Sequence, residues 1–217
     1  NGNPSGTLAN GLAHYLKINP EDNKNIRVGI VHRLDKETSG LMVIAKNLKS
    51  HEIISKQFSD RLVKKKYHAL VWGRMINDSG IINENIMRDK KNRIKFNVSQ
   101  TFGRESITKY KIIKRYENFT FVELSPKTGR THQIRVHMKF LGHPIICDSL
   151  YGGGEDRCLN YHSNNQKKIR NVFKLINRVA LHAFFLEIIH PFSNKNIKFK
   201  IDLTDDFKKV INILDEE

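Results

Sequence analysis

The sequence contains few cysteines and no long apolar run, and each shortage excludes a class of protein. Among 217 residues there are two cysteines, Cys147 and Cys158, and they form no C-x-x-C pair. This excludes a disulfide scaffold and a zinc knuckle, and it favours a reducing compartment. No apolar run approaches the ~18 residues that a membrane-spanning helix requires. The chain opens on the loop-like NGNPSGT without an initiator Met, so we expect an N-terminal piece outside this chain.

Acidic residues are scarce relative to basic ones. The sequence has 22 Asp and Glu against 38 Lys and Arg, which gives a formal net charge of +16. A surplus of this size favours a polyanionic partner, most often nucleic acid. A general abundance of Lys and Asn is the alternative explanation. A chain of 217 residues can bury one good core, so we expect one domain.

Apolar periodicity predicts strands in clusters with a few interspersed helices, the pattern of an α+β fold. Helices are expected at residues 7–16, from a cap at Ser50 to about residue 61, at 131–141 before the C-terminal cap Gly142, and after the cap Thr204. Strands are expected at residues 28–31, 41–46, 67–72, 106–116, 119–125, 180–189 and 197–203. The strands at 106–116 and 119–125 should form a hairpin.

A dense charge cluster stands between two of these expected strands. The segment HRLDKETSG, residues 32–40, follows the apolar VGIV and precedes LMVIA. A carboxylate between two buried strands would be held rigidly, as catalysis requires, which makes Asp35 a candidate catalytic residue. Glu37 shares the turn and should point to solvent. The alternative is ordinary turn chemistry, because Asp, Ser and Gly are common turn formers.

A second charged segment, TGRTHQIRVHM at residues 128–138, opens an expected helix. It carries Arg130, His132, Arg135 and His137. A buried arginine is costly to desolvate without a carboxylate partner. Asp35 is the natural partner for Arg135, and the pair would keep the carboxylate ionised even when buried.

Four segments together resemble the RluA-type pseudouridine synthases of ribosomal RNA. They are HRLDKETSG, KKKYHALVWG (residues 64–73), TGRTHQIRVHMKFLGHPIICDSLYG (128–152) and RVALHAFFLEIIHP (178–191). They come in the order of that family and span nearly the whole chain. The opening NGNPSGTLANGLAHYL is similar to the RluD-type branch, which acts on large-subunit ribosomal RNA.

This resemblance implies a fold, a reaction and a partner. The fold would be the α+β pseudouridine synthase fold, a mixed and largely antiparallel sheet with flanking helices. Residues 1–217 would form one catalytic domain, without the family's N-terminal S4 RNA-binding domain and first strand motif. The reaction would be isomerisation of uridine to pseudouridine in large-subunit (23S-type) ribosomal RNA or its precursor, with no cofactor and no metal. The protein would be a cytoplasmic monomer without membrane contact; an organelle is the alternative location.

The resemblance also assigns catalytic roles. Asp35 would be the essential carboxylate, which attacks the sugar or the base or removes a sugar proton; these alternatives stay open. Arg135 would pair with Asp35 and set its geometry. Tyr67 would lie against the uracil ring and could help to remove the C5 proton. The alternative for Tyr67 is an ordinary strand tyrosine.

Five further residues would contact the substrate. Leu181 would pack against the base, although it also fits a core position. Arg33 would fill the space left by a flipped-out uridine or contact a phosphate, and His32 would support the turn. Lys66, beside Tyr67, and Arg130 would bind the RNA backbone, although a charged stretch is often only a solvated face.

Two other classes of function are considered from the sequence. A non-catalytic RNA-binding module would require the loss of Asp35 or Arg135, and a nucleoside hydrolase would require a second carboxylate in a matching motif. His132, His137 and His143 are spaced five and six apart, which does not suit a zinc site. The run of Gly152 to Gly154 lacks the Lys and Ser or Thr of a P-loop, so we expect only a flexible turn.

Overall fold

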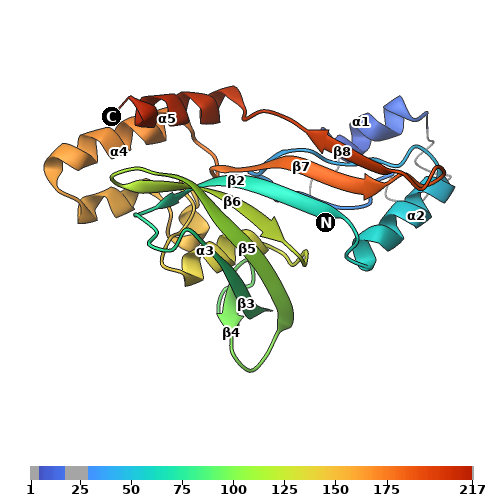
Figure 1. Ribbon diagram of the computed structural model, residues 1–217, viewed down its shortest axis with the longest axis horizontal. Coiled ribbons are helices and arrows are strands. Elements are labelled where there is room, and N and C mark those ends of the chain that lie inside the picture. The colour runs from blue at the N-terminus through green and yellow to red at the C-terminus, as the bar shows by residue number, and fades with distance from the viewer. Residues whose placement is uncertain (1–4, 18–28, 217) are drawn as a thin grey trace. The chain divides into compact units, whose positions relative to one another are not determined.

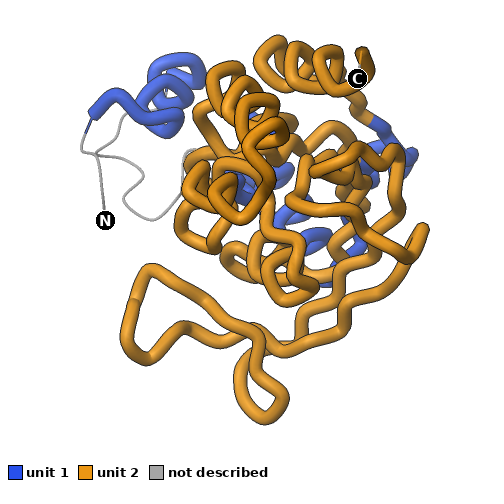
Figure 2. Tube along the Cα trace, turned by 90° about the vertical axis from the view of Figure 1, so that its left-hand side faces the viewer, with its two compact units in different colours: residues 1–34, 42–63, 187–198 blue, residues 35–41, 64–186, 199–217 orange. Residues whose placement is uncertain are grey.

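The computed structural model describes residues 5–17 and 29–216, and the chain divides into two compact units. Unit 1 comprises residues 1–34, 42–63 and 187–198, and unit 2 comprises residues 35–41, 64–186 and 199–217 (Figure 2). Each unit is described by itself below. The expectation of one catalytic domain over residues 1–217 stays a prediction. No helix in the described ranges is long and apolar enough to cross a membrane.

The described residues of unit 1 form two helices. Helix α1 (Leu8–Tyr15) begins as predicted, because Thr7 and Asn10 form a reciprocal capping box. Helix α2 (Leu48–Ser59) begins before the predicted cap at Ser50. Asn47 is the actual N-cap, and its side chain accepts a hydrogen bond from the backbone N–H of Ser50 at 2.9 Å. The prediction was wrong because Asn is at least as good a cap as Ser and stands three residues earlier.

The two buried strands predicted around the charged turn are not regular strands. Val28 lies outside the described residues, and the rest of both segments forms one isolated antiparallel bridge, between Ile30 and Ile44. Gly29 explains the break, since its φ of +70° is unlike a strand. A Cβ on Gly29 would also overlap the carbonyl oxygen of Ala45, whose N–H donates to the Gly29 carbonyl at 2.9 Å.

The described strands form one mixed sheet of eight, in the order β1-β7-β2-β6-β5-β3-β4, with β8 also paired to β7 (Figure 1). The bounds are β1 Ser39–Gly40, β2 Lys64–Trp72, β3 Ser79–Arg88, β4 Phe96–Ser99, β5 Arg104–Arg115, β6 Phe119–Pro126, β7 Leu181–Ile189 and β8 Asn196–Lys200. Residues 187–189 and 196–198 of this sheet belong to unit 1. The pairs β2–β6, β5–β6, β3–β5 and β3–β4 are antiparallel, and β1–β7 is parallel. The predicted α+β class with a largely antiparallel sheet is confirmed.

Unit 2 also contains the helices α3 (Gln133–Phe140), α4 (Ser163–Leu175) and α5 (Asp205–Asp215), and the short turns η1 (Ser149–Tyr151) and η2 (Glu155–Asn160). The β5–β6 hairpin, α3 and α5 were predicted, but β3, β4 and α4 were not. Strand β3 reads SGIINENIMR, whose polar residues hide the alternation. Helix α4 starts after His162, which makes no side-chain cap.

The core of unit 2 is built on β2, which lies between β7 and β6 in the sheet. Residues 69–72 of this strand have no exposed surface. They pack in one cluster with Met138 of α3, Val172 of α4 and Phe207 of α5. Three helices and the sheet therefore share one apolar core, which fixes the backbone on which the polar residues below are mounted.

Gly153 is held rigidly, so the expected flexible turn at Gly152 to Gly154 is wrong. Its N–H donates to the carbonyl of Asp148, and its own carbonyl accepts from Cys147 N–H, both at 2.8 Å. The same carbonyl accepts from the indole Nε1 of buried Trp72 at 3.0 Å. A Cβ on Gly153 would overlap the carbonyl oxygen of Ile145.

Substitution Gly153→Ala is therefore expected to destabilise unit 2 by about 3 kcal/mol or more, because the added methyl group must displace backbone. Gly152→Ala is the matched control. Gly152 has a φ of +83° and open space around the missing Cβ, so only a conformational cost of about 1–2 kcal/mol applies. Urea denaturation followed by fluorescence of Trp72, the one tryptophan, measures both. Equal effects of the two substitutions would contradict the steric argument.

Candidate functional site

The turn that carries Asp35 is closed by its own backbone. The N–H of Thr38 donates to the carbonyl of Asp35 at 2.9 Å. The next two residues, Ser39 and Gly40, form β1. The turn is therefore short and ends directly in the sheet, in a two-residue strand that precedes the segment 41–46 for which a strand was predicted.

Strand β1 attaches this turn to the start of β7. Ser39 pairs in parallel with His182, and Gly40 pairs with Ala183. The Oγ of Ser39 is hydrogen-bonded to Nδ1 of His182 at 2.8 Å. Burial lowers the pKa of His182, so its ring is neutral near pH 7. A Cβ on Gly40, whose φ is +122°, would overlap the backbone of Ala183, so only glycine permits this close approach.

Helix α3 carries Arg135 and is fixed at its start by a buried glutamine. The Oγ1 of Thr128 donates to Oε1 of Gln133 at 2.7 Å, and Nε2 of Gln133 donates to the carbonyl of Ile107 at 3.0 Å. His132 precedes the helix with a φ of +55°. These hydrogen bonds hold the sharp turn by which the chain enters α3, and Arg135 lies buried on the first turn of the helix.

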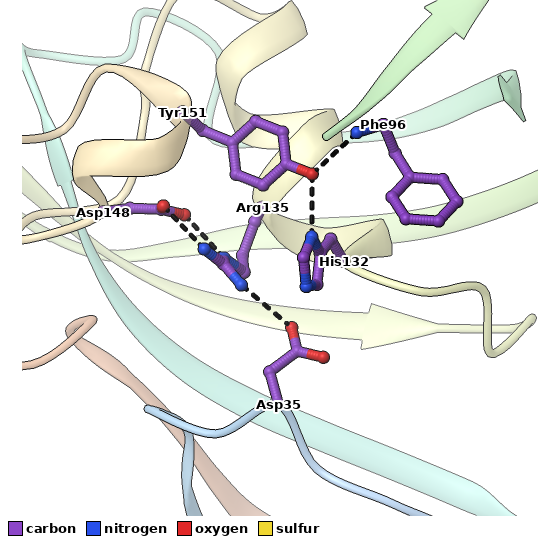
Figure 3. Close-up of polar contacts among 6 residues, drawn as sticks. All are labelled: Asp35, Phe96, His132, Arg135, Asp148 and Tyr151. Atoms are coloured by element: carbon purple, nitrogen blue, oxygen red, sulfur yellow. Dashed lines mark hydrogen bonds and ion pairs between the residues drawn. The ribbon is translucent and has the colours of Figure 1, made fainter. Parts of the chain in front are cut away.

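Arg135 binds two carboxylates, and the one that the sequence analysis did not anticipate binds more closely (Figure 3). Its Nε and Nη2 donate to the two oxygens of Asp148 at 2.7 and 2.8 Å. Its Nη1 lies 3.5 Å from Oδ2 of Asp35. The exposed fractions of the side chains are 10% for Arg135, 1% for Asp148 and 19% for Asp35. The expected pairing of Asp35 with Arg135 is therefore present, but Asp148 is a second, bidentate partner at shorter distances.

This arrangement keeps a positive charge next to Asp35. Burial by itself would lower the pKa of Arg135, but the hydrogen bonds and charge of Asp148, together with the charge of Asp35, raise it overall. Because Asp148 occupies the edge of the guanidinium that Nε and Nη2 form, the contact with Asp35 is made by the third nitrogen, Nη1. Asp35 is thus held near a cation while its other oxygen is not engaged by that arginine.

The ring of Tyr151 packs against the guanidinium of Arg135. Its ring centroid lies 5.0 Å from the guanidinium carbon. Its hydroxyl accepts a hydrogen bond from the N–H of Phe96 at 3.0 Å and is bonded to Nδ1 of His132 at 2.8 Å (Figure 3). Burial raises the pKa of Tyr151 to about 12, so the hydroxyl is protonated at pH 7.

Tyr67 lies on β2, opposite Leu124 of β6, and is half-buried. Burial raises the pKa of Tyr67, and the negative charge of Asp35 raises it further. The side chain is therefore a neutral phenol at pH 7. Asp35 is close enough to Tyr67 for its charge to act on the phenol, and Asp35 also contacts Arg135. The three predicted catalytic side chains therefore lie in one neighbourhood of unit 2.

The other predicted residues have contacts of their own. Leu181 is buried at the start of β7, within the main core. Lys66 forms an ion pair with Glu123 at 2.9 Å, and its side chain is 42% exposed. Arg130 is half-buried, and its Nε donates to the carbonyl of Glu105 at 3.3 Å.

The two predicted residues before Asp35 belong to unit 1. Nε2 of His32 accepts a hydrogen bond from the N–H of Val43 at 2.9 Å, and its ring stacks on Phe58 with centroids 4.5 Å apart. Arg33 is exposed. Within unit 1, His32 therefore ties the chain before the turn to the segment after it.

No group of three or more His, Cys, Asp or Glu in residues 5–17 and 29–216 is arranged to hold a metal ion. The three histidines considered above have separate partners. His132 bonds to Tyr151, buried His137 bonds to Oγ1 of Thr108 at 2.9 Å, and Nδ1 of His143 lies 2.8 Å from the carbonyl of Trp72.

The sequence analysis missed Asp148 and Tyr151. Both stand in the segment CDSLYG, which was used only as part of a resemblance. The available signal was the requirement that a buried arginine be fully paired, since a guanidinium with five donors is seldom satisfied by one carboxylate. That requirement predicts a second acid beside Arg135.

Comparisons with known proteins agree on one family. The family model described as RNA pseudouridylate synthase matches residues 6–140. Ribosomal large subunit pseudouridine synthase D of Buchnera aphidicola is 42% identical over 213 residues, which cover 97% of this chain and 64% of that protein. The protein of the same name from Neisseria meningitidis serogroup B is 38% identical and is covered to 54%. The chain thus spans between half and two thirds of the length of these relatives. Human RNA Pseudouridylate Synthase Domain Containing 1 superposes with a TM-score of 0.66 at 25% identity, over 83% of this chain and 72% of that one.

Proposed function

Because this chain belongs to the RNA pseudouridylate synthase family, we propose that it isomerises uridine to pseudouridine in large-subunit ribosomal RNA. One observation carries the proposal: Asp35 is held against Arg135 on a turn that is attached to β7. The family and the names of the relatives supply the reaction class and the substrate. We also propose that the chain acts in the cytoplasm. It would act there as a monomer and without a cofactor.

Asp35 is proposed as the essential carboxylate. Cleavage of the bond between uracil and C1′ leaves the sugar short of electrons, and a carboxylate can trap or stabilise that centre. The base then rotates and reattaches through C5. The 3.5 Å contact with Arg135 is made by one carboxylate oxygen of Asp35, Oδ2. Attack on the sugar, attack on the base and removal of a sugar proton are all compatible with this arrangement.

Arg135 is proposed to fix the position of Asp35 and not to bind phosphate. Its side chain is 10% exposed, and its Nε and Nη2 are engaged by Asp148. The remaining Nη1 faces Asp35. A guanidinium that one carboxylate holds through two nitrogens presents its third nitrogen at a defined angle, which is the geometric requirement for positioning a catalytic acid.

The other predicted residues are proposed to bind the nucleotide. Leu181 would contact the uracil, and Lys66 and Arg130 would contact the RNA backbone. Arg33, two residues before Asp35, would take the space of the extruded uridine or contact a phosphate. His32 would support the turn. Extrusion costs a few kcal/mol and is cheaper in a loop, so an unpaired uridine is the expected target.

A nucleoside hydrolase is the competing enzyme class, because Asp148 is a second carboxylate near Asp35. Asp148 is 1% exposed and both of its oxygens bind Arg135, so it is not available to protonate a leaving base or to activate water. The geometry therefore favours isomerisation over hydrolysis.

The function is tested by product analysis. The 217-residue chain is incubated with a transcript of large-subunit ribosomal RNA, and the nucleosides are separated after complete digestion. We expect pseudouridine without free uracil, whereas free uracil would indicate a hydrolase and no change would contradict an active synthase. Mass-sensitive mapping of large-subunit RNA from cells that lack the gene would then identify the uridine.

Tyr67→Phe is expected to lower the rate of pseudouridine formation at saturating RNA by about 10²-fold, the lower range for loss of a positioned acid–base group. The raised pKa of Tyr67 favours a role as a neutral phenol against the base over a role as a ready proton acceptor. The aromatic ring remains, so the midpoint of urea denaturation should change little. A large loss of stability with an unchanged rate would show that Tyr67 is only a strand residue. Tyr110→Phe, on β5, which β6 separates from β2 in the sheet, is the matched control.

A further inference from the structure

A basic loop connects β3 and β4, and neither the catalytic residues nor the core accounts for it. We call residues 88–95, RDKKNRIK, the basic hairpin loop. Five of its eight residues are Lys or Arg, and Asp89 is its one acid. Lys90, Lys91 and Arg93 are all exposed. The loop is one of the strongest concentrations of positive charge in the sequence.

Asp89, the one acid in this loop, forms hydrogen bonds that hold the loop in its conformation. Oδ1 of Asp89 accepts hydrogen bonds from the backbone N–H groups of Lys91 and Asn92, both at 2.8 Å, and Oδ2 accepts from the side chain of Asn97. The backbone bonds from Asn92 and Lys91 lower the pKa of Asp89. The N–H of Asp89 donates to the carbonyl of Lys95 at 2.9 Å, which closes the loop. The loop is thus prefolded, with its negative charge directed inward and its cations exposed.

A single side chain, that of Tyr151, connects the end of this loop with Arg135. Phe96 follows the loop as the first residue of β4, and its N–H donates to the hydroxyl of Tyr151. The guanidinium carbon of Arg88 lies 5.3 Å from the ring centroid of Phe96. Tyr151 is 1% exposed, packs with Ile86 of β3, and places its ring 5.0 Å from Arg135 (Figure 3).

We propose that the basic hairpin loop binds the phosphate backbone of the RNA strand that carries the target uridine, and that Tyr151 holds this loop in position relative to Arg135. The inference rests on the proposed function, since it assumes an RNA substrate. A cationic loop whose backbone is already folded binds phosphates at a lower ordering cost than an unfolded one, and single-stranded RNA leaves its backbone accessible. Tyr151 is a positioning residue: it touches Phe96 and Arg135 but is too buried to touch RNA.

The test measures RNA binding separately from catalysis. The probe is a fluorescein-labelled stem-loop RNA with unpaired uridines, and its dissociation constant from the 217-residue chain is measured over a series of KCl concentrations. The loop variant is Lys90→Ala, Lys91→Ala and Arg93→Ala combined. The matched control is Lys167→Ala, Arg170→Ala and Lys174→Ala combined, which removes two lysines and one arginine from exposed positions of α4.

We expect the loop variant to flatten the slope of log Kd against log salt by about 2, since each phosphate contact to a single strand contributes about 0.7. The control should change the slope by less than about 0.7, the value of one contact. Equal slopes in the loop variant and the control would overturn the proposal. Pseudouridine formation by the unchanged chain, measured in parallel, reports on the proposed function independently of these slopes.

Tyr151→Phe tests the positioning role, because it removes the hydroxyl and keeps the ring against Arg135. We expect RNA affinity to fall about fivefold, the effect of one lost hydrogen bond, with an unchanged rate at saturating RNA. In the background of the loop variant the same substitution should have less than about half of that effect, since the two act through one contact surface. A full fivefold effect in that background, or a loss of rate at saturation, would overturn the role assigned to Tyr151.

Discussion

Asp35→Asn is expected to abolish pseudouridine formation, with a loss of at least about 10³-fold in the single-turnover rate, as when one member of a catalytic unit is removed. The amide has nearly the shape of the carboxylate and can still accept a hydrogen bond from Nη1 of Arg135, so the fold should be retained. The charge and the nucleophilic or basic oxygen are lost. Affinity for RNA should stay within about threefold, because removal of a negative charge does not weaken attraction to a polyanion.

Glu37→Gln is the control for this experiment, because it removes the same charge from the same turn at an exposed position. It should leave the rate within about twofold, as expected of an exposed group outside a catalytic unit. Rates are measured with excess enzyme, and binding is measured with the labelled RNA. Full activity of Asp35→Asn would refute the assignment of this carboxylate, whatever the outcome for Glu37.

Asp148→Ala is expected to have the largest effect on stability. It leaves the buried guanidinium of Arg135 without its bidentate partner, and removal of one member of a buried pair costs about 3–5 kcal/mol. For a chain of this size, this corresponds to a fall in Tm of roughly 10 °C. The rate of pseudouridine formation should fall as well, since the arginine is then free to turn toward Asp35 and bind both of its oxygens.

A double substitution separates these two effects. Arg135→Met with Asp148→Leu replaces the buried pair by apolar side chains, which is often neutral or stabilising. We expect it to recover most of the stability lost in Asp148→Ala, measured by Trp72 fluorescence in urea, while the activity stays absent. Recovery of both stability and activity would show that the arginine and its partner serve only the fold.

The parts of the fold that the sequence predicted are those in which local chemistry and packing agree. The β5–β6 hairpin combines strong alternation with a tight turn, and α5 begins at Thr204 with Asp205 and Asp206 in its first turn. Strand β4 could not be predicted in this way. It has four half-buried residues, and it is a strand because β3 lies beside it and Tyr151 binds its first N–H.

The candidate site was also predicted only in part. Asp35, Tyr67 and Arg135 were selected from charge, burial and resemblance, and they lie in one neighbourhood. Asp148 was not selected, because its role depends on the bend after Ile146, where Cys147 adopts a φ of +64°. A non-glycine residue in that conformation is uncommon and cannot be read from a short apolar run. The direction in which the next side chain points is therefore a property of the folded chain.

The attachment of β1 to β7 also limits how the chain can vary in length. Each residue of extended chain spans ~3.3 Å. One residue inserted or removed between Asp35 and Gly40 would move the carboxylate by about that distance, since Gly40 is pressed against Ala183 and cannot slide. The displacement is close to the whole length of the contact between Asp35 and Arg135. The number of residues in this turn should therefore be fixed as strictly as the identity of its acid.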